Sequence, residues 1–271
     1  MVRKPTRKEV THFHRVVYDC YRRLGRSFPW RETDDPYEIF VSEMMLQQTP
    51  VQRVMGKYEE FLKHFPIVQK LAEADLSSVL KVWSGIGYNR RALYLRNAAR
   101  KICEIHGGTI PSSLKALLNL PGVGQSTAGA LLNFAFRIPT PFVETNIRRA
   151  ITHFFQIPGE TRDGEILSLV DATMDRKNPR TWFYALMDYG ASLRRRPEKG
   201  EKKEHRHEPF RGSRREKRGK VLRALLSLGE LTLEELERET GEERSQLTPL
   251  LRDMVEEGLL KQKGEFFLVG E

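Results

Sequence analysis

Most of the chain shows apolar residues spaced three and four positions apart, which is typical of amphipathic helices. Residues 51–64 and residues 91–105 each place five apolar or small side chains on one face in this way. Residues 126–136 are almost entirely small or apolar, so this helix should be buried on all sides. Runs of Val, Ile and Tyr with period two are scarce. The pattern over residues 1–193 therefore predicts an all-α domain.

The pattern changes near the C-terminus. Residues 215–228 predict one helix, and a capping box from Thr232 to Glu235 opens a second, shorter one. A third helix is expected at about 244–257. The last residues read as a two-stranded hairpin with a Lys-Gly turn at 263–264. Three helices and a hairpin predict a small winged helix-turn-helix domain.

A strongly basic stretch joins these two parts. Residues 194–220 hold 13 Lys or Arg and 5 Glu, a net charge of +8, whereas the whole chain carries +10. Phe210 is the single large apolar residue of this stretch, so it cannot form a core. We therefore predict a helical domain at 1–193, a basic linker at 194–214 and a winged-helix domain at 215–271.

Composition narrows the class of protein. The 271 residues include 46 Lys or Arg and 36 Asp or Glu, so we expect a polyanionic partner, and nucleic acid fits better than a membrane surface. Cys20 and Cys103 are too few for a disulfide framework, a four-thiolate zinc site or a four-thiolate iron–sulfur cluster. No apolar run is long enough for a signal peptide or a membrane span. We expect an intracellular monomer, cytoplasmic and associated with the nucleoid, that binds no membrane.

The first candidate site is a turn that leads into the small-residue helix. Its residues are Leu120, Pro121, Gly122, Val123, Gly124, Gln125 and Ser126. The proline fixes one φ angle, and the glycines allow backbone conformations that other residues avoid. The N–H groups of such a turn open onto a helix N-terminus, which can hold a DNA phosphate, and its carbonyls can hold a monovalent cation. The composition favours a helix-hairpin-helix over an ordinary helix–helix turn.

Two carboxylates are candidates for acid–base chemistry. Glu43 stands in the apolar stretch 39–46, where an unpaired carboxylate is costly. Burial would raise its pKa and let it donate a proton near neutral pH. The alternative is that Glu43 caps a helix or pairs with a core arginine. Glu144 precedes a basic helix start, where an acid favoured by the helix dipole is the simpler explanation.

These motifs occur together in one known family. From about residue 10 to 193 the chain resembles the helix-hairpin-helix DNA glycosylases, and within them the MutY-like adenine glycosylases. The matching segments are FPWR at 28–31, DPY at 35–37, SEMMLQQT at 42–49, GIGY at 85–88, LPGVGQSTAGA at 120–130, and Asn146 with Arg149. Because several motifs occur in order, the match is specific. It implies a two-lobed all-α glycosylase domain.

The resemblance implies an enzyme that flips a mispaired or damaged base out of double-stranded DNA and hydrolyses its N-glycosidic bond, with adenine opposite 8-oxoguanine or guanine as the target. Glu43 would protonate the purine ring, and Glu144 would stabilise positive charge on the sugar or attack it. Tyr88 would enter the vacated stack, while Gln48 and Leu46 would probe the mismatch. Further candidates for contact with DNA are Thr49, Asn146, Arg149, Arg194, Arg195 and Arg196.

The chain departs from the family pattern in ways that change the expectations. Glu144 replaces the family's catalytic Asp, which moves the carboxylate by about an ångström and can cost orders of magnitude in rate. Ser126 stands where bifunctional relatives carry a Schiff-base lysine, so we expect a monofunctional enzyme without efficient lyase activity. Asn89 replaces a second tyrosine.

Two further departures concern whole modules of the family. The four cluster cysteines are absent, so we expect no iron–sulfur cluster and no metal held by side chains. The winged helix stands in place of the domain that reads 8-oxoguanine. Its third helix offers donors at Arg244, Ser245, Gln246 and Arg252 among acidic neighbours, so both DNA and a protein partner stay open for it.

Two alternatives to the adenine glycosylase stay open. The same fold could remove thymine or uracil opposite guanine, or a deaminated purine. A protein of another class would bind damaged or structured DNA without catalysis. If both carboxylates line one pocket beside Tyr88, the enzyme is favoured. If Glu144 pairs with Arg148 or Arg149 away from a pocket, the binding protein is favoured.

Overall fold

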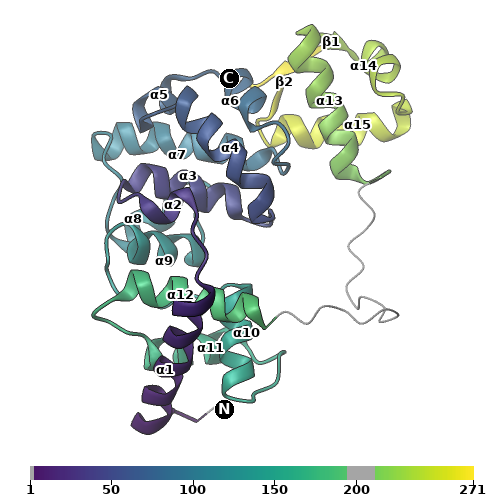
Figure 1. Cartoon of the computed structure of the whole chain (residues 1–271). Coiled ribbons are helices and arrows are strands. Elements are labelled where there is room, and N and C mark those ends of the chain that lie inside the picture. The colour runs from purple at the N-terminus through teal and green to yellow at the C-terminus, as the bar shows by residue number, and fades with distance from the viewer. Residues whose placement is uncertain (1–2, 194–210) are drawn as a thin grey trace. The chain divides into compact units, whose positions relative to one another are not determined.

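The computed structural model describes residues 3–193 and 211–271. The chain divides into two compact units, one formed by Met1–Met44 with Ile110–Lys199 and the other by Met45–Thr109 with Gly200–Glu271. Each unit therefore combines two segments that are far apart in sequence. Helices dominate the described residues, and their strands form one small sheet (Figure 1). The all-α prediction is confirmed. None of the described helices is both long and apolar enough to span a membrane.

The first unit is helical throughout its described residues. Its helices are α1 (Arg7–Leu24), α2 (Pro29–Glu32), most of α3 (Pro36–Leu46), α8 (Leu114–Leu118), α9 (Gln125–Phe134), α10 (Thr145–Phe154), α11 (Asp163–Thr173) and α12 (Pro179–Ser192). Helix α12 packs mainly against α1 and α10. Trp182, Phe183 and Leu186 on α12 are fully buried. The Tyr184 ring stacks on Phe134 of α9, with ring centroids 4.2 Å apart. Helix α12 is thus the centre of this core.

A glycine sets the distance between α12 and the start of α10. A Cβ atom on Gly190 would lie only 1.9 Å from the carbonyl oxygen of Asn146. Arg149 of α10 donates a hydrogen bond to the carbonyl of Gly190 at 3.1 Å. The absence of a side chain at position 190 therefore lets the first turn of α10 lie directly on α12, which fixes the position of Glu144 just before that turn.

The second unit begins with α4 (Val51–His64), α5 (Val68–Glu73), α6 (Leu76–Trp83) and α7 (Arg90–His106). Helix α7 packs against α5 and α6, and the apolar face predicted for it is buried through Leu95, Ala99 and Ile102. Trp83 at the end of α6 is fully buried and meets Phe61 of α4 edge to face. The helices predicted at 51–64 and 91–105 are confirmed to within about two residues.

The C-terminal part, residues 211–271, adds helices and a sheet to the second unit. Its elements are α13 (Arg214–Leu228), β1 (Leu231–Thr232), α14 (Leu233–Thr240), α15 (Arg244–Glu256), β2 (Leu260–Lys263) and β3 (Phe266–Val269). The strands are antiparallel in the order β1-β3-β2, with Phe267 opposite both Leu231 and Gln262. The sequence predicted only the hairpin, because a strand of two residues is too short to show a period.

Replacing Gly190 with alanine tests the close approach of α10 and α12. The added Cβ would meet a backbone carbonyl, which cannot rotate away, so we expect Gly190→Ala to lower the free energy of unfolding by about 2 kcal/mol or more. Gly164→Ala is the matched control in the same unit, because a Cβ there has no neighbour within 4 Å. Chemical denaturation measures both variants. An unchanged midpoint for Gly190→Ala would contradict the packing described here.

Candidate active site

Glu43 lies on α3 among fully buried apolar side chains. Its neighbours along the helix include Phe40, Val41 and Met44, none of which is exposed. Burial and the nearby charge of Glu144 raise the pKa of Glu43, the charge of Arg31 lowers it, and the net result is a pKa of about 8. Glu43 therefore keeps its proton at neutral pH, as the apolar surroundings predicted.

Glu144 is the N-cap of α10. Its Oε1 accepts a hydrogen bond from the N–H of Ile147 at 2.7 Å, and its Oε2 accepts one from the amide of Asn146 at 3.2 Å. N-cap residues usually have shorter side chains. The extra methylene of Glu144 is accommodated because the side chain folds back onto its own helix, and both carboxylate oxygens are thereby held.

The same donors decide the charge of Glu144. Burial raises its pKa, while the N–H groups of Asn146 and Ile147 and the charge of Arg149 lower it, and the net result is a raised pKa. Two carboxylates that interact in a site of low polarity do not both ionise at neutral pH. The helix N-terminus favours the anion on Glu144, whereas no donor of this kind among the described residues opposes the raised pKa of Glu43.

Arg148 does not hold Glu144 away from this site. Its guanidinium donates to the carbonyls of Gly159 and Thr161 and pairs with Asp163. Arg149 donates to the side-chain oxygen of Asn146 at 3.0 Å. Glu144 is thus not paired with Arg148, and its charge raises the pKa of Glu43, while the pocket beside Tyr88 stays a prediction.

A buried ion pair forms another part of the site. Asp188 of α12 accepts hydrogen bonds from both η nitrogens of Arg31, at 2.8 and 3.0 Å, and from the backbone N–H of Arg26 at 2.9 Å. Burial opposes ionisation of Asp188, but these donors outweigh it and hold its pKa below the usual range. The Arg31 guanidinium lies 4.4 Å from the centroid of the Tyr184 ring. Asp188 thus holds the guanidinium of Arg31, whose charge lowers the pKa of Glu43.

The sequence reasoning missed Asp188 and gave Arg31 no role. A signal was present, because Asp188 is the single acidic residue in the apolar helix Pro179–Ser192. The same observation, a carboxylate within an apolar helix, identified Glu43. Pairing Asp188 with Arg31 required the tertiary structure, since 157 positions separate the two residues.

The predicted hairpin turn precedes α9 in the first unit. Leu120 and Val123 are buried, and Gly122 has a φ of +74°, which favours glycine. Gly124 is the N-cap of α9 and provides no side-chain hydrogen bond to the helix. Gln125 is exposed and Ser126 is half-buried. The first N–H groups of α9 therefore have no side-chain cap, which suits an anion.

The residues predicted to probe the mismatch, Leu46, Gln48 and Tyr88, all belong to the second unit. Leu46 is also the last residue of α3. Gln48 and Tyr88 are exposed, and both have left-handed backbone angles, with φ of +53° and +50°. Leu46 is half-buried. Thr49 is buried, and its hydroxyl accepts a hydrogen bond from Arg91 at 2.8 Å. Arg194, Arg195 and Arg196 lie outside the described residues.

A cofactor site does not emerge from the described side chains. Across residues 3–193 and 211–271, no three His, Cys, Asp or Glu residues lie together as metal ligands would. The carbonyls of the turn at 120–124 are the candidate ligands for a monovalent cation, and that cation stays a prediction.

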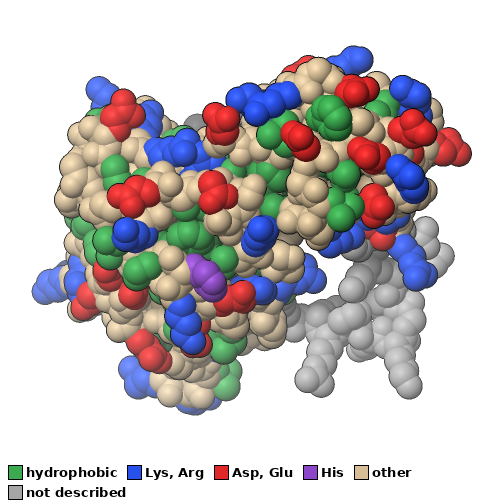
Figure 2. Space-filling model, turned by 90° about the horizontal axis from the view of Figure 1, so that it is seen from above, with side chains coloured by type: hydrophobic (Ala, Val, Ile, Leu, Met, Phe, Trp, Pro, Cys, Tyr) green, Lys and Arg blue, Asp and Glu red, His purple; other side chains and the backbone are tan. Residues whose placement is uncertain are grey.

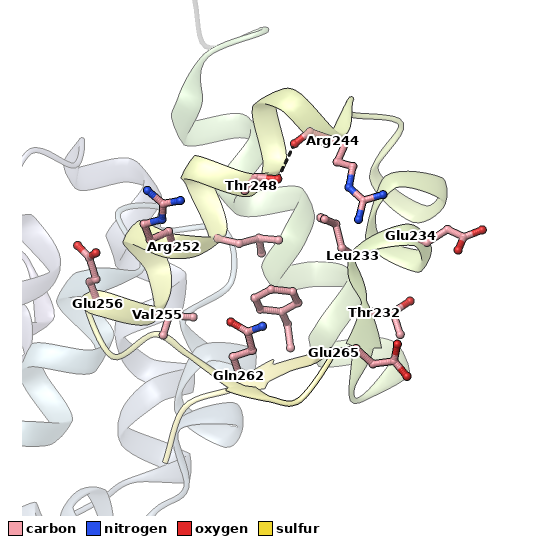
Figure 3. A pocket seen from close by; sticks show the side chains of 12 residues that line it. Thr232, Leu233, Glu234, Arg244, Thr248, Arg252, Val255, Glu256, Gln262 and Glu265 are labelled. Atoms are coloured by element: carbon pink, nitrogen blue, oxygen red, sulfur yellow. Dashed lines mark hydrogen bonds between the residues drawn. The ribbon is translucent and has the colours of Figure 1, made fainter.

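The C-terminal part carries a separate pocket of about 570 Å³ (Figure 3). Helix α15, the strands β2 and β3 and the start of α14 form its walls, with Leu251 and Phe267 among the apolar lining. The charged lining residues are Glu234, Arg244, Arg252, Glu256 and Glu265. All three glutamates are exposed, so this pocket lacks the shielded acid that Glu43 provides.

Comparison with known proteins shows that the chain is similar to DNA repair proteins. Residues 41–171 match the family described as HhH-GPD superfamily base excision DNA repair protein. The adenine DNA glycosylase of Buchnera aphidicola (subsp. Baizongia pistaciae) is 36% identical over 186 residues, which are 67% of this chain and 52% of that protein. The adenine DNA glycosylase of Mycobacterium tuberculosis is 36% identical over 181 residues, which are 64% of this chain and 59% of the relative. The chain thus spans little more than half the length of these relatives.

Solved structures agree with this comparison. A thermostable thymine-DNA glycosylase superposes with a TM-score of 0.66 at 29% identity, covering 70% of this chain and 90% of that one. An endonuclease III bound non-covalently to DNA superposes with a TM-score of 0.58 at 14% identity, covering 66% and 84%, and shares the fold. The sequence motifs, the all-α fold and these matches agree, and the chain belongs to the HhH-GPD superfamily of base excision DNA repair proteins.

Proposed function

We propose that this protein is a DNA glycosylase that hydrolyses the N-glycosidic bond of adenine mispaired with 8-oxoguanine or guanine. The observation that carries the proposal is a pair of interacting carboxyl groups, in which burial raises the pKa of Glu43 and in which hydrogen bonds from Ile147 and Asn146 hold both oxygens of Glu144. Adenine leaves a sugar readily only when its ring is protonated. The relatives named adenine DNA glycosylases support adenine as the base.

The two carboxylates divide the chemistry between them. Glu43 donates its proton to a ring nitrogen of the flipped adenine, so the base leaves as a neutral molecule. The C–N bond breaks, and positive charge develops on the sugar. The Glu144 carboxylate stabilises that charge, and water completes the hydrolysis. Glu144 is suited to this task because hydrogen bonds from Ile147 and Asn146 orient it before the reaction.

In this proposal duplex DNA is bound by the turn that precedes α9 and by the turns that carry Gln48 and Tyr88. The N–H groups at the start of α9 hold a backbone phosphate, which is supported by the lack of a side-chain cap at Gly124. Tyr88 and Gln48 enter the stack as the base flips out. Ser126 has no amine to form a Schiff base, so the product is an abasic site with its strand intact.

A thymine or uracil glycosylase is the second candidate. The specific observation in its favour is the similarity to a thymine-DNA glycosylase, which covers 90% of that chain. The two candidates differ in the leaving group. Thymine and uracil lack the ring nitrogen that Glu43 would protonate in a purine. The raised pKa of Glu43 therefore favours the purine.

The C-terminal part, which we propose is a winged helix, suits a protein partner better than DNA. Residues 211–271 contain 13 Asp or Glu and 12 Lys or Arg, and the acids predominate after α13, where residues 229–271 contain 12 Asp or Glu and 5 Lys or Arg. Some basic side chains of α13 pair with acids of this part, for example Lys220 with Glu242 and Arg218 with Glu257, whereas Arg215 donates a hydrogen bond to the Tyr88 hydroxyl. Acidic and basic side chains are interspersed on the face shown in Figure 2. The acids that follow α13 repel phosphates and attract a protein that presents basic side chains.

We expect the wild type to release adenine opposite 8-oxoguanine or guanine and to leave a site that breaks only in alkali. Glu43→Gln and Glu144→Gln should each lower the single-turnover rate by about 100-fold or more, because one removes the proton donor and the other the anion. Glu38→Gln is the matched control on α3 and should keep the wild-type rate. A panel of duplexes with adenine, thymine, uracil or hypoxanthine opposite each base measures this.

Other outcomes of the same panel would contradict the proposal. Release of thymine or uracil opposite guanine, without release of adenine, would establish the second candidate. Tight binding of mispaired duplex with no release of any base would establish a binding protein.

The pH profile should reveal the proton on Glu43. The carboxyl must be protonated to act as an acid, and its pKa is raised to about 8. The single-turnover rate should therefore fall about tenfold per unit as the pH rises beyond about 8. Measurements at constant ionic strength and saturating enzyme isolate the chemical step, and a binding titration at each pH confirms saturation. A rate that increases with pH through this range would exclude Glu43 as the acid.

Arginines on α15 should contribute little to binding of duplex DNA. Because acidic residues surround Arg244 and Arg252, we expect Arg244→Ala with Arg252→Ala to change the dissociation constant of mispaired duplex by less than about twofold, with an unchanged salt dependence. Fluorescence anisotropy at two salt concentrations measures both quantities. Binding that weakens about tenfold or more would assign this face to DNA.

A further inference from the structure

Two turns in the second unit hold strained residues at their tips. Gln48 and Tyr88 have φ angles of +53° and +50°, a region that residues other than glycine seldom adopt. Among the described residues only two more non-glycine side chains share this feature, Arg137 and Gln156. Such strain persists only where surrounding contacts enforce it. The two tips therefore need a restraint.

Arg91, in the first turn of α7, makes contacts that supply this restraint. Its Nη1 donates hydrogen bonds to the carbonyls of Met45, at 2.8 Å, and Gln47. Its Nη2 donates to the Thr49 hydroxyl at 2.8 Å and to the Gly87 carbonyl at 3.0 Å. Three acceptors thus flank Gln48, and the fourth directly precedes Tyr88. One guanidinium joins both turns.

The surroundings of Arg91 make this link rigid. The side chain is buried, with 7% of its surface exposed. Its guanidinium carbon lies 5.3 Å from the centroid of the Tyr88 ring and 5.5 Å from that of Trp83. The indole N–H of Trp83 also donates to the Gly87 carbonyl at 3.1 Å. The turn at 85–88 is therefore held from two sides.

We propose that Arg91 is a positioning residue that locks the Gln48 turn to the Tyr88 turn, so that both tips enter the DNA stack as one rigid wedge. This inference rests on the proposed function, because it assigns a task to the residues that would probe the mismatch. Stacked bases resist the insertion of a side chain between them. Two turns that are not linked to each other would be displaced by this resistance. The planar fork of arginine reaches both turns at once, which the single ammonium of lysine cannot do.

The test compares Arg91→Lys with Arg100→Lys, an exposed position on the same helix. Mispaired duplexes carry the fluorescent purine 2-aminopurine at the target position, so that unstacking is read without cleavage. We expect Arg91→Lys to reduce the fluorescence rise on binding and to slow single-turnover release of adenine by about tenfold or more, whereas Arg100→Lys keeps wild-type behaviour. Thermal unfolding of both variants, followed by circular dichroism, monitors the fold.

A second substrate separates positioning from general damage. Adenine opposite a one-nucleotide gap is already partly unstacked, so Arg91→Lys should release it within about threefold of the wild-type rate. Equal losses on the paired and gapped substrates would overturn the proposal. A double-mutant cycle with Tyr88→Ala adds a further criterion, since Arg91→Lys should cost little more once the wedge is gone. Full additivity of the two losses would also overturn it.

The two failures are distinguishable. If the wild type unstacks 2-aminopurine but cleaves no base, the proposed function fails. The fluorescence rise of Arg91→Lys relative to the wild type then still tests the role of Arg91. If the wild type binds mispaired duplex without unstacking the target, there is no wedge and the inference is overturned.

Discussion

The proximity of two carboxylates is the constraint on which the candidate site depends. A carboxyl in apolar surroundings holds its proton more tightly, and a neighbouring negative charge strengthens that effect. Glu43 provides the first condition and Glu144 the second, while the backbone N–H of Ile147 at the start of α10 favours the anion on Glu144. The charge of Arg31 lowers the pKa of Glu43. The different surroundings of two residues of the same type thus arise from their positions in the fold.

Those positions are set by packing at some distance from the carboxylates. Gly190 lets α10 lie on α12. Asp188, two residues earlier on α12, accepts hydrogen bonds from Arg31 and holds it in place. Helix α12 therefore controls both the anion and the cation that act on Glu43. The apolar residues of α12 form the core of the first unit. Its small residue Gly190 and its polar residue Asp188 determine where the charges of the site lie.

The sequence predicted the helices well where one face is apolar over several turns, as in α4 and α7. It predicted Glu43 because a charged residue stands out in an apolar helix. It did not reveal β1, which is two residues long, or the pairing of Asp188 with Arg31, which joins distant segments. Glu144 was ambiguous for a physical reason, since an N-cap and a catalytic anion need the same carboxylate at the same helix end. In the structure that carboxylate both caps α10 and acts on Glu43.

The division of the chain into interleaved segments has a consequence for its synthesis. Residues Met45–Thr109 interrupt the first unit, whose helix α1 packs mainly against α12 and also contacts α11 and, through Phe13, Phe154 of α10. His14, for example, contacts the carbonyl of Thr173, 159 positions later. A chain emerging from the ribosome therefore exposes the apolar face of α1 until most of the helical region has been made. The inserted helices α4 to α7 contact one another over short sequence separations and are able to fold before α1 meets its partners, although α1 is translated before them.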